Sequence, residues 1–207
     1  MDHESITAYV SLGSNLGDRA GNLLLAVRGL LESSLCVQRL SAIYETEPVG
    51  VENHFPYLNM VAEIRVTNVS PKQMLARMIR IEYLLGRRHK FMKAPRTVDL
   101  DLLFYGDFQD SNPYLTIPHP RLHERRFVLV PLVELSPTIY HPVLKKRVQQ
   151  ILEEVKDTSS VVRWNANQTE NGDLKGNVKR KTENGKLKME AIRKISIQAE
   201  KRKMKEI

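Results

Sequence analysis

The sequence contains a single cysteine, Cys36, so no disulfide can form within the chain. One cysteine also fits a reducing compartment, and we expect it to be a small buried hydrophobe. No apolar run approaches the roughly 20 residues that a membrane-spanning helix needs. The opening Met-Asp-His-Glu-Ser is acidic and polar and lacks the apolar segment of a signal peptide. These absences predict a cytoplasmic protein without a membrane partner.

The chain also has little net charge outside its C-terminal end. Residues 158–207 contain 13 Lys and Arg against 6 Asp and Glu, whereas residues 1–157 contain 19 against 18. Of the net charge of +8, the C-terminal end therefore carries +7. From residue 158 on, Asn, Gly, Lys and Glu dominate, which is typical of a disordered segment. We expect one domain over 1–157, a monomer, and a basic low-complexity extension over 158–207.

Helical and strand patterns follow one another in a recognisable order. Asp18 and Ser70 are the expected N-caps of two helices, and Gly86 follows the second. The order strand-helix-strand-strand-helix-strand is the ferredoxin-like split arrangement, so the predicted class is α+β. Residues 116–157 add a C-terminal helical and hairpin segment. The expected strands cover 6–12, 37–46, 58–67 and 97–105, and the expected helices cover 19–33, 71–85, 121–134 and 145–156.

A glycine-containing segment, 13–18, follows the first strand and could be mistaken for a phosphate-binding loop. The Lys-Ser or Lys-Thr pair that should follow such a loop is missing, and Asp18 would repel phosphate. We therefore interpret the segment as a turn that leads into the first helix.

Two carboxylates, Asp99 and Asp101, lie two residues apart in the last of these strands. Residues i and i+2 of a strand point the same way, with Cα atoms about 7 Å apart. That spacing suits a pair of metal ions about 3.5–4 Å apart. Carboxylate oxygens suit Mg²⁺, and no His or Cys cluster has zinc-like spacing. The alternative is a half-exposed strand with two solvated acids. The expected apolar face of the strand consists of Val98, Leu100, Leu102 and Phe104.

Cationic side chains accompany this acidic pair. Guanidinium groups bind phosphate oxygens in a bidentate manner, and Lys acts as a point charge. Their clustering next to two acids favours a nucleotide that carries Mg²⁺, although any one of them alone could be a solvated surface charge. The set consists of Arg87, Arg88, His89, Lys90, Arg96, His119 and Arg125.

Three further residues could bind a flat heterocycle. Tyr57 and Asn59 would share one strand face, and such a ring needs an aromatic surface and an in-plane amide. Phe127 could supply a second ring surface. The alternative is core packing for Tyr57 and a strand-edge amide for Asn59.

Together these segments resemble the 6-hydroxymethyl-7,8-dihydropterin pyrophosphokinase family of folate biosynthesis, over about residues 5–157. The Pro-Arg-x-x-Asp-Leu-Asp element at 95–101 is specific, and the other segments occur in the same order. The resemblance implies transfer of the β,γ-diphosphate of ATP to the pterin hydroxymethyl oxygen, with release of AMP. The segments that carry it are 13–17, 46–50, 57–59, 80–82, 86–87, 95–101 and 118–127.

The resemblance also implies roles for individual residues. Asp99 and Asp101 would hold two Mg²⁺ ions, with Arg87 and Arg96 as further catalytic residues. The pterin would lie between Tyr57 and Phe127, with its polar edge read by Asn59 and by backbone groups around Thr46 and Pro48. Glu82 has an alternative interpretation as a helix acid paired with a neighbouring Arg. The implied ATP site consists of Glu82, Arg87, Arg88, Arg96, Thr116, His119 and Arg125.

The loop before Pro95 departs from the family pattern. It is about one residue shorter than in some relatives, and Lys93 stands where an aromatic residue is common. The correspondence of Arg88 and His89 to the family's second loop arginine is therefore open. These differences concern the contacts of the loop and the rate more than the reaction.

Two other functions are compatible with parts of the pattern. A ferredoxin-like sheet with a basic extension is also the outline of an RNA-binding domain, but such a domain needs aromatic residues on its exposed sheet face, where Asp99 and Asp101 stand. We therefore expect no specific nucleic-acid partner. A catalytically inactive pterin- or nucleotide-binding scaffold is the second alternative, and the acidic pair argues against it.

Overall fold

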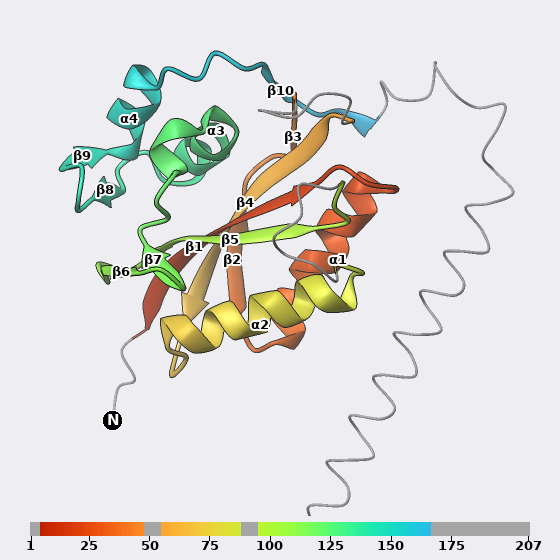
Figure 1. Cartoon of the computed structure of the whole chain (residues 1–207), viewed down its shortest axis with the longest axis horizontal. Helices are drawn as coiled ribbons and strands as arrows, with labels where there is room; N and C mark the ends of the chain where they lie inside the picture. The colour runs from red at the N-terminus through yellow and green to blue at the C-terminus, as the bar shows by residue number, and fades with distance from the viewer. Residues whose placement is uncertain (1–4, 48–54, 88–94, 167–207) are drawn as a thin grey trace, which may run out of the picture. The chain divides into compact units, whose positions relative to one another are not determined.

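The computed structural model describes residues 5–47, 55–87 and 95–166 (Figure 1). The chain divides into a compact unit, Met1–Trp164, and a second unit, Asn165–Ile207, of which only the first two residues are described. The fold below is that of the first unit. The predictions for Pro48, Arg88 and the loop that contains Lys93 lie outside the described residues.

Three long antiparallel strands form the centre of the sheet. Strand β1 (Ile6–Ser14) pairs with β4 (Tyr57–Val66) on one side and with β5 (Asp99–Tyr105) on the other. Most residues of these strands are buried, and the alternation that the sequence patterns predict is replaced by continuous buried runs over residues 8–14 of β1 and 58–62 of β4. The α+β class with an antiparallel sheet is therefore confirmed.

The other edge of β4 is shared by two short strands rather than one long strand. β2 (Cys36–Leu40) and β3 (Tyr44–Thr46) both pair with β4, and β10 (Val161–Arg163) extends the sheet from β3. The prediction of one continuous strand over 37–46 was therefore wrong.

Two helices cover one face of the sheet. Helix α1 (Arg19–Glu32) begins after Asp18, whose side chain caps the first turn, as predicted. Helix α2 (Pro71–Leu84) begins after Ser70, which forms a reciprocal capping box with Gln73. Figure 1 shows both helices on the same side of β1, β4 and β5. The larger core cluster lies between them and the sheet.

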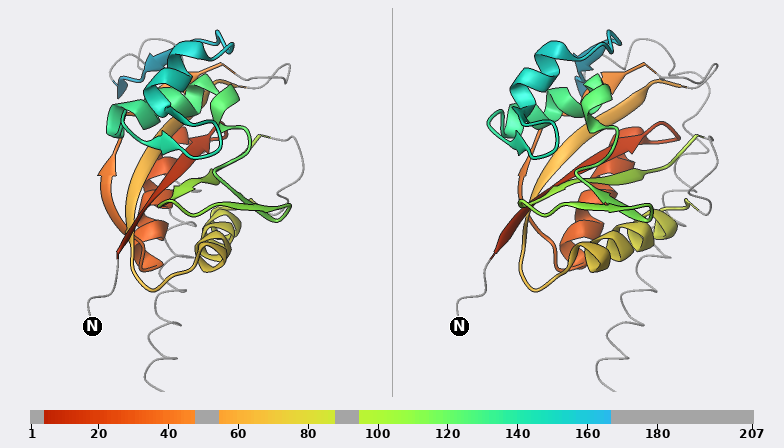
Figure 2. Two further views of the ribbon diagram at one scale, coloured as in Figure 1. Left: turned by 90° about the vertical axis from the view of Figure 1, so that its left-hand side faces the viewer. Right: turned by 60° about the vertical axis from the view of Figure 1, so that its left-hand side comes forward.

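The opposite face carries the C-terminal helices, so the unit has three layers (Figure 2). A 3₁₀ turn, η1 (Leu122–Glu124), precedes α3 (Arg126–Leu135), and α4 (Val148–Glu154) packs beside α3. A second core cluster fills this side and includes Leu129 and Leu132. The single helix predicted over 121–134 is thus a short turn followed by α3.

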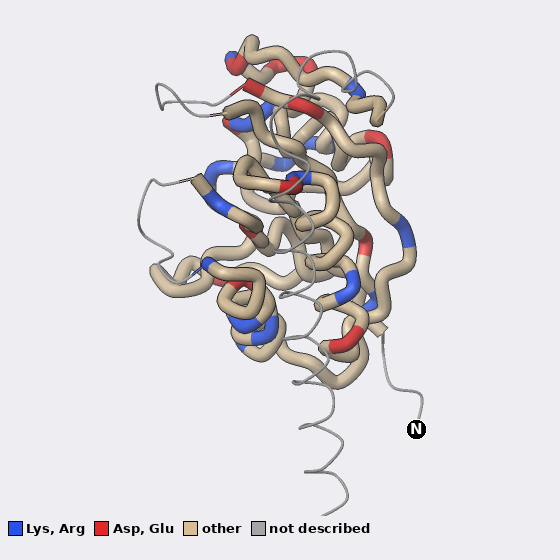
Figure 3. The backbone as a smooth tube through the Cα atoms, turned by 90° about the vertical axis from the view of Figure 1, so that its right-hand side faces the viewer, with Lys and Arg blue, Asp and Glu red and all other residues tan. Residues whose placement is uncertain are grey.

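Two small hairpins complete the described unit. β6 (Asp110–Asn112) pairs with β7 (Leu115–Ile117), and β8 (Tyr140–His141) pairs with β9 (Lys146–Arg147). Basic and acidic positions are interspersed along the described backbone, as expected from the near-balance of charge before residue 158 (Figure 3). None of the described helices has the length and apolar composition required to cross a membrane.

A β-bulge in β5 changes the face of the sheet to which the side chains of its last residues point. Tyr9 pairs with Phe104 but Val10 pairs with Leu102, so Leu103 is the extra residue. Leu102 packs with α1 and α2, whereas Leu103 and Phe104 pack with α3. The prediction that Phe104 shares a face with Leu102 was therefore wrong.

Two other features differ from expectation. Cys36 is exposed rather than buried because it lies opposite the exposed Arg65, while Val37 takes the inward position. Residues 158–166 were assigned to the extension because they contain few apolar residues, yet they include β10. Trp164 donates its backbone N–H to the carbonyl oxygen of Ile43 at 2.8 Å and packs against the core.

Candidate active site

Four of the predicted site residues, Tyr57, Asn59, Asp99 and Asp101, lie on the sheet face that faces α3. In β4, Leu58 and Met60 pack toward α1 and α2, so Tyr57 and Asn59 point to the opposite face. In β5 the same alternation turns Asp99 and Asp101 to that face, opposite Leu100 and Leu102.

Strand register brings the two halves of the site together. Gly13 of β1 pairs with Asn59 on one side and with Asp99 on the other. Asn59 and Asp99 therefore lie in one row across three adjacent strands, separated only by a residue without a side chain. A Cβ atom on Gly13 would lie 2.8 Å from Oδ1 of Asn59.

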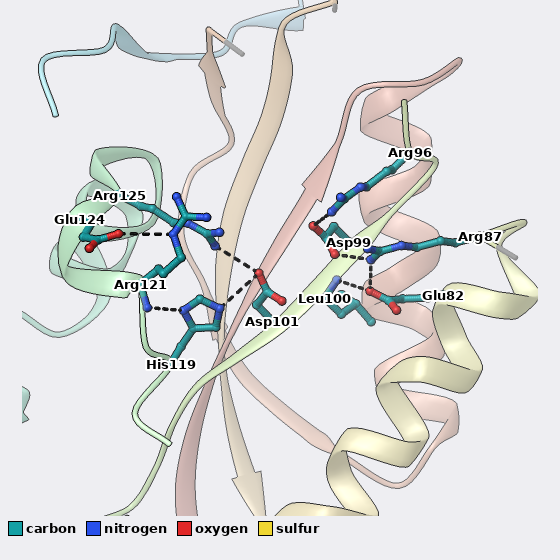
Figure 4. Close-up of polar contacts among 10 residues, drawn as sticks. All are labelled: Glu82, Arg87, Arg96, Asp99, Leu100, Asp101, His119, Arg121, Glu124 and Arg125. Atoms are coloured by element: carbon teal, nitrogen blue, oxygen red, sulfur yellow. Dashed lines mark hydrogen bonds and ion pairs between the residues drawn. The ribbon is translucent and has the colours of Figure 1, made fainter. Parts of the chain in front are cut away.

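Asp99 lies between two guanidinium groups. Nη1 of Arg87 donates to Oδ1 of Asp99, and Nη1 of Arg96 donates to its Oδ2 (Figure 4). Burial raises the pKa of Asp99, but the two arginines outweigh this effect and hold the pKa below its usual value. Asp99 is therefore a carboxylate at neutral pH.

The contacts of Glu82 explain why this acid lies on the inward face of α2. Its side chain is buried, and Oε1 accepts both from Nη1 of Arg87 and, at 2.8 Å, from the backbone N–H of Leu100. The acid thus ties α2 to β5 and holds the arginine that contacts Asp99. Glu82 is thus paired with a neighbouring arginine, and its assignment to the ATP site stays a prediction.

Asp101 has two neighbours of its own on the side of α3, Arg125 and His119. Its Oδ2 lies 3.5 Å from Nη1 of Arg125 and 3.8 Å from Nε2 of His119 (Figure 4). Burial lowers the pKa of His119, and the negative charge of Asp101 partly offsets this effect by raising it. Nδ1 of His119 accepts the backbone N–H of Arg121 at 3.2 Å, so the neutral ring carries its proton on Nε2, toward Asp101.

A buried polar pair adjoins this cluster. Nδ2 of Asn59 donates to Oγ1 of Thr46 at 2.7 Å, and both residues are buried. The bond fixes the amide orientation and leaves Oδ1 of Asn59 beside Gly13. An amide held in this way can present an in-plane acceptor to a ligand.

The two predicted aromatic surfaces are both half-buried. Burial raises the pKa of Tyr57, and the charges of Arg96 and Asp99 also act on its hydroxyl, so the ring lies near the acidic cluster. Phe127 lies in the first turn of α3 and packs against the second core cluster. The guanidinium of Arg125 lies 5.7 Å from the centroid of the Phe127 ring.

Thr116 shows no contact with this cluster among the described interactions. It lies in β7, and its hydroxyl donates to the carbonyl oxygen of Asn112 at 3.0 Å. Its assignment to the ATP site stays a prediction.

The donor set fits a hard divalent cation that arrives with a ligand. Among the described residues, no group of three or more His, Cys, Asp or Glu side chains could hold a metal ion. Asp99 and Asp101 alone would supply protein oxygens, and Mg²⁺ typically takes the remaining positions from water and substrate phosphates.

Comparison with known proteins identifies the family to which the chain belongs. The family model for 7,8-dihydro-6-hydroxymethylpterin-pyrophosphokinase (HPPK) matches residues 9–137. The chain belongs to this family. Its matched region contains Gly13, Asn59 and the acidic pair Asp99 and Asp101, which the strand register brings together.

Individual relatives agree with the HPPK assignment. A 2-amino-4-hydroxy-6-hydroxymethyldihydropteridine pyrophosphokinase of Aquifex aeolicus is 35% identical over 144 residues, which are 70% of this chain and 89% of that protein. The Bacillus subtilis protein of the same name is 43% identical over 129 residues, 62% of this chain and 77% of that one. A solved Plasmodium falciparum HPPK-DHPS with pteroate has a TM-score of 0.59 and 17% identity, covering 74% of this chain and 43% of that chain. The last likeness concerns the fold alone.

Some contributors to the site could not be found from the sequence. Gly13 was assigned only to a turn, although its strand register places it between Asn59 and Asp99. Asn15, in the same segment, bonds to the backbone of Arg96. No local pattern indicates either contact, since both join segments that are far apart in the sequence.

Proposed function

We propose that the chain transfers the β,γ-diphosphate of ATP to the hydroxymethyl oxygen of 6-hydroxymethyl-7,8-dihydropterin, with AMP and the pterin diphosphate as products. Family membership makes the chain an ATP-dependent pyrophosphokinase of folate biosynthesis. The observation that carries the detailed proposal is the row Asn59, Gly13 and Asp99, which joins a polar heterocycle-binding group to an acidic, arginine-flanked group.

Asp99 and Asp101 are the residues that would hold two Mg²⁺ ions. Both lie on one face of β5, and neither is fully exposed. Bound Mg²⁺ would neutralise phosphate charge and lower the pKa of the attacking hydroxyl. The proton of that hydroxyl can pass to water, so the proposal needs no protein general base.

The cations of the site would bind and orient the triphosphate. Arg87, Arg96 and Arg125 lie beside the two aspartates and Glu82, so the arginine and carboxylate charges of the cluster offset one another, and the neutral His119 ring adds a hydrogen-bond donor. Phosphate oxygens are equivalent partners for guanidinium groups, so these side chains can exchange a carboxylate for a phosphate. Diphosphate transfer requires this positioning and charge compensation more than covalent help from the protein. Glu82, Arg88 and Thr116 complete the proposed ATP site.

The pterin would bind beside Gly13. Asn59, held by Thr46, would read its polar edge together with backbone groups near Pro48, and Tyr57 and Phe127 would cover its two faces. The ring's hydroxymethyl group would then lie on the side of Asp99. Arg125, which contacts both Phe127 and Asp101, would connect the pterin and phosphate parts of the site.

The finer features of the chain belong to the same proposal. We assign the core to the ferredoxin-like arrangement, since the order β5-β1-β4-β2 with α1 and α2 on one face matches its topology. We also propose a cytoplasmic monomer with no specific nucleic-acid partner, followed by a basic C-terminal extension.

The proposed function is tested by the nucleotide product. The protein is incubated with Mg-ATP and hydroxymethyldihydropterin, and the nucleotides are separated by chromatography. AMP that forms only when pterin is present supports diphosphate transfer. ADP would indicate single-phosphate transfer, and the absence of any product would favour an inactive binding scaffold.

A further inference from the structure

A two-bond contact joins Asn15 to the backbone of Arg96. The backbone N–H of Asn15 donates to the carbonyl oxygen of Arg96 at 3.1 Å. The side-chain Oδ1 of Asn15 accepts the backbone N–H of Arg96 at 2.6 Å. One residue thus satisfies both backbone groups of the arginine.

Arg96 needs such support because it lies outside the sheet. Strand β5 begins only at Asp99, so the ladder bonds between β1 and β5 start three residues later. The guanidinium of Arg96 nevertheless contacts Asp99. The direction of this long side chain depends on where its own backbone is held.

The segment that contains Asn15 is itself fixed by α1. Asn22 of α1 donates from Nδ2 to the carbonyl oxygen of Leu16 at 2.8 Å and to Oγ of Ser14 at 3.4 Å. Both neighbours of Asn15 are therefore held by one buried amide. The helix, the segment and the arginine form a continuous chain of contacts that ends at Asp99.

Burial indicates which part of the Asn15 side chain matters. The residue is 1% exposed, and Nδ2 has no hydrogen-bond partner in the described structure. A buried donor without a partner is unfavourable, so the side chain contributes here through its oxygen.

We propose that Asn15 is a positioning residue that sets the direction of the Arg96 guanidinium for the reaction. The proposal rests on the role of Arg96 in the proposed function. It gives a chemical task to the segment 13–18, which the sequence alone indicated only as a turn.

A double-mutant cycle tests this link. Turnover and the KM values for ATP and pterin are measured for the full chain and for Asn15→Ala, Arg96→Ala and the double variant. We expect Asn15→Ala to lower kcat by about 10- to 100-fold, the range that a small misplacement of a catalytic group can cost. In the Arg96→Ala background the same change should lower kcat by less than about 2-fold, since coupled residues are not additive.

Ser41→Ala is the matched control, because the buried Ser41 side chain also accepts a backbone N–H, that of Val61 at 2.9 Å, but lies outside this chain of contacts. It should lower the melting temperature and change kcat by a similar factor in both backgrounds. Asn15→Asp keeps the accepting oxygen and should retain more turnover than Asn15→Ala. If Asn15→Ala does not fold, Asn15→Ser replaces it in the cycle, with the same expected outcomes.

The cycle separates the positioning role from the proposed function. An equal loss from Asn15→Ala in both backgrounds would overturn the positioning role alone. An Arg96→Ala protein with unchanged turnover would overturn the role of Arg96 and, with it, the proposal for Asn15.

Discussion

Gly13 and Asn59 lie opposite each other on adjacent strands, so close that a Cβ atom on Gly13 would lie 2.8 Å from Oδ1 of Asn59. Real Cβ atoms essentially never approach an oxygen this closely, so an added methyl group must displace the amide. The extended backbone at this position would accept alanine, and the constraint is therefore one of space. The row that connects the proposed pterin and metal parts of the site depends on this missing side chain.

Gly13→Ala is expected to raise the KM for pterin by about 10-fold, equivalent to roughly 1.4 kcal/mol, and to change the KM for ATP little. Gly29→Ala is the matched control, because its Cβ would also meet a neighbour too closely, Cγ2 of Ile81 at 2.9 Å, but between α1 and α2. The control should lower the melting temperature without a selective effect on pterin. Equal pterin KM values for Gly13→Ala and the parent would contradict the proposed pterin site.

Asp99→Ala and Asp101→Ala should each abolish measurable turnover while the fold is retained. Losing a metal ligand removes on the order of several kcal/mol of transition-state stabilisation, which corresponds to a decrease of about 1,000-fold or more. Rates are measured beside circular dichroism spectra. Asp107→Ala, an exposed acid just after β5, is the control and should keep normal turnover. Retained activity in both site variants would refute the metal assignment.

The sequence predicted the acidic pair well because its signal is local. Asp99 and Asp101 are two residues apart, and strand alternation alone turns them to one face. The predicted face of Phe104 was wrong because the bulge at Leu103 arises from pairing with β1, and no pattern within the strand itself indicates it. The bond from the N–H of Leu100 to Glu82 is likewise tertiary, so the sequence indicated the charge of Glu82 but not its role in joining α2 to β5.

The predicted boundary between the domain and the C-terminal extension differs from the structure for another reason. Composition assigned everything after residue 157 to a polar extension, yet a short edge strand needs few apolar residues. β10 is held by backbone pairing with β3, and Trp164, the residue that follows it, packs against the core. The mostly exposed strand β2, which contains Cys36, shows the same difficulty, since the inward and outward positions of its residues depend on its pairing with β4.

A chain that ends after Ala166 should therefore fold and turn over like the full chain, whereas one that ends after Asp157 should fold with lower stability and turn over more slowly. The shorter chain loses β10 and the contact of Trp164 with the core, worth about 1.5–3 kcal/mol for a large apolar side chain. It also loosens β3, which carries Thr46. Urea unfolding followed by circular dichroism measures the difference. Equal stability of the two truncated chains would place the end of the folded unit before β10.

Acid should weaken the fold through Glu63. Hydrogen bonds from Arg39 lower the pKa of this carboxyl, against the effect of burial, and Tyr9 donates to it at 2.9 Å. Because the folded pKa lies below the unfolded value, this stabilisation is present above the unfolded pKa and is lost as the pH falls through the folded one. Glu63→Gln should thus melt at a lower temperature than the parent at pH 7, and the gap should narrow toward pH 3.

The control for this pH dependence is Glu32→Gln. Glu32 forms an exposed pair with Arg28 within α1, and such surface pairs contribute little. Its melting temperature should stay near that of the parent across the range. A gap between Glu63→Gln and the parent that stays constant from pH 7 to pH 3 would show that the ionised form of Glu63 is not the source of the stabilisation.

The most direct test of the central claim follows the phosphorus atoms of ATP. The protein is supplied with pterin and with Mg-ATP that carries a radioactive label in the α, the β or the γ phosphate in three parallel reactions. Diphosphate transfer predicts that the β and γ labels both appear in the pterin product while the α label stays in AMP. A pterin product that carries the γ label but not the β label would contradict the account.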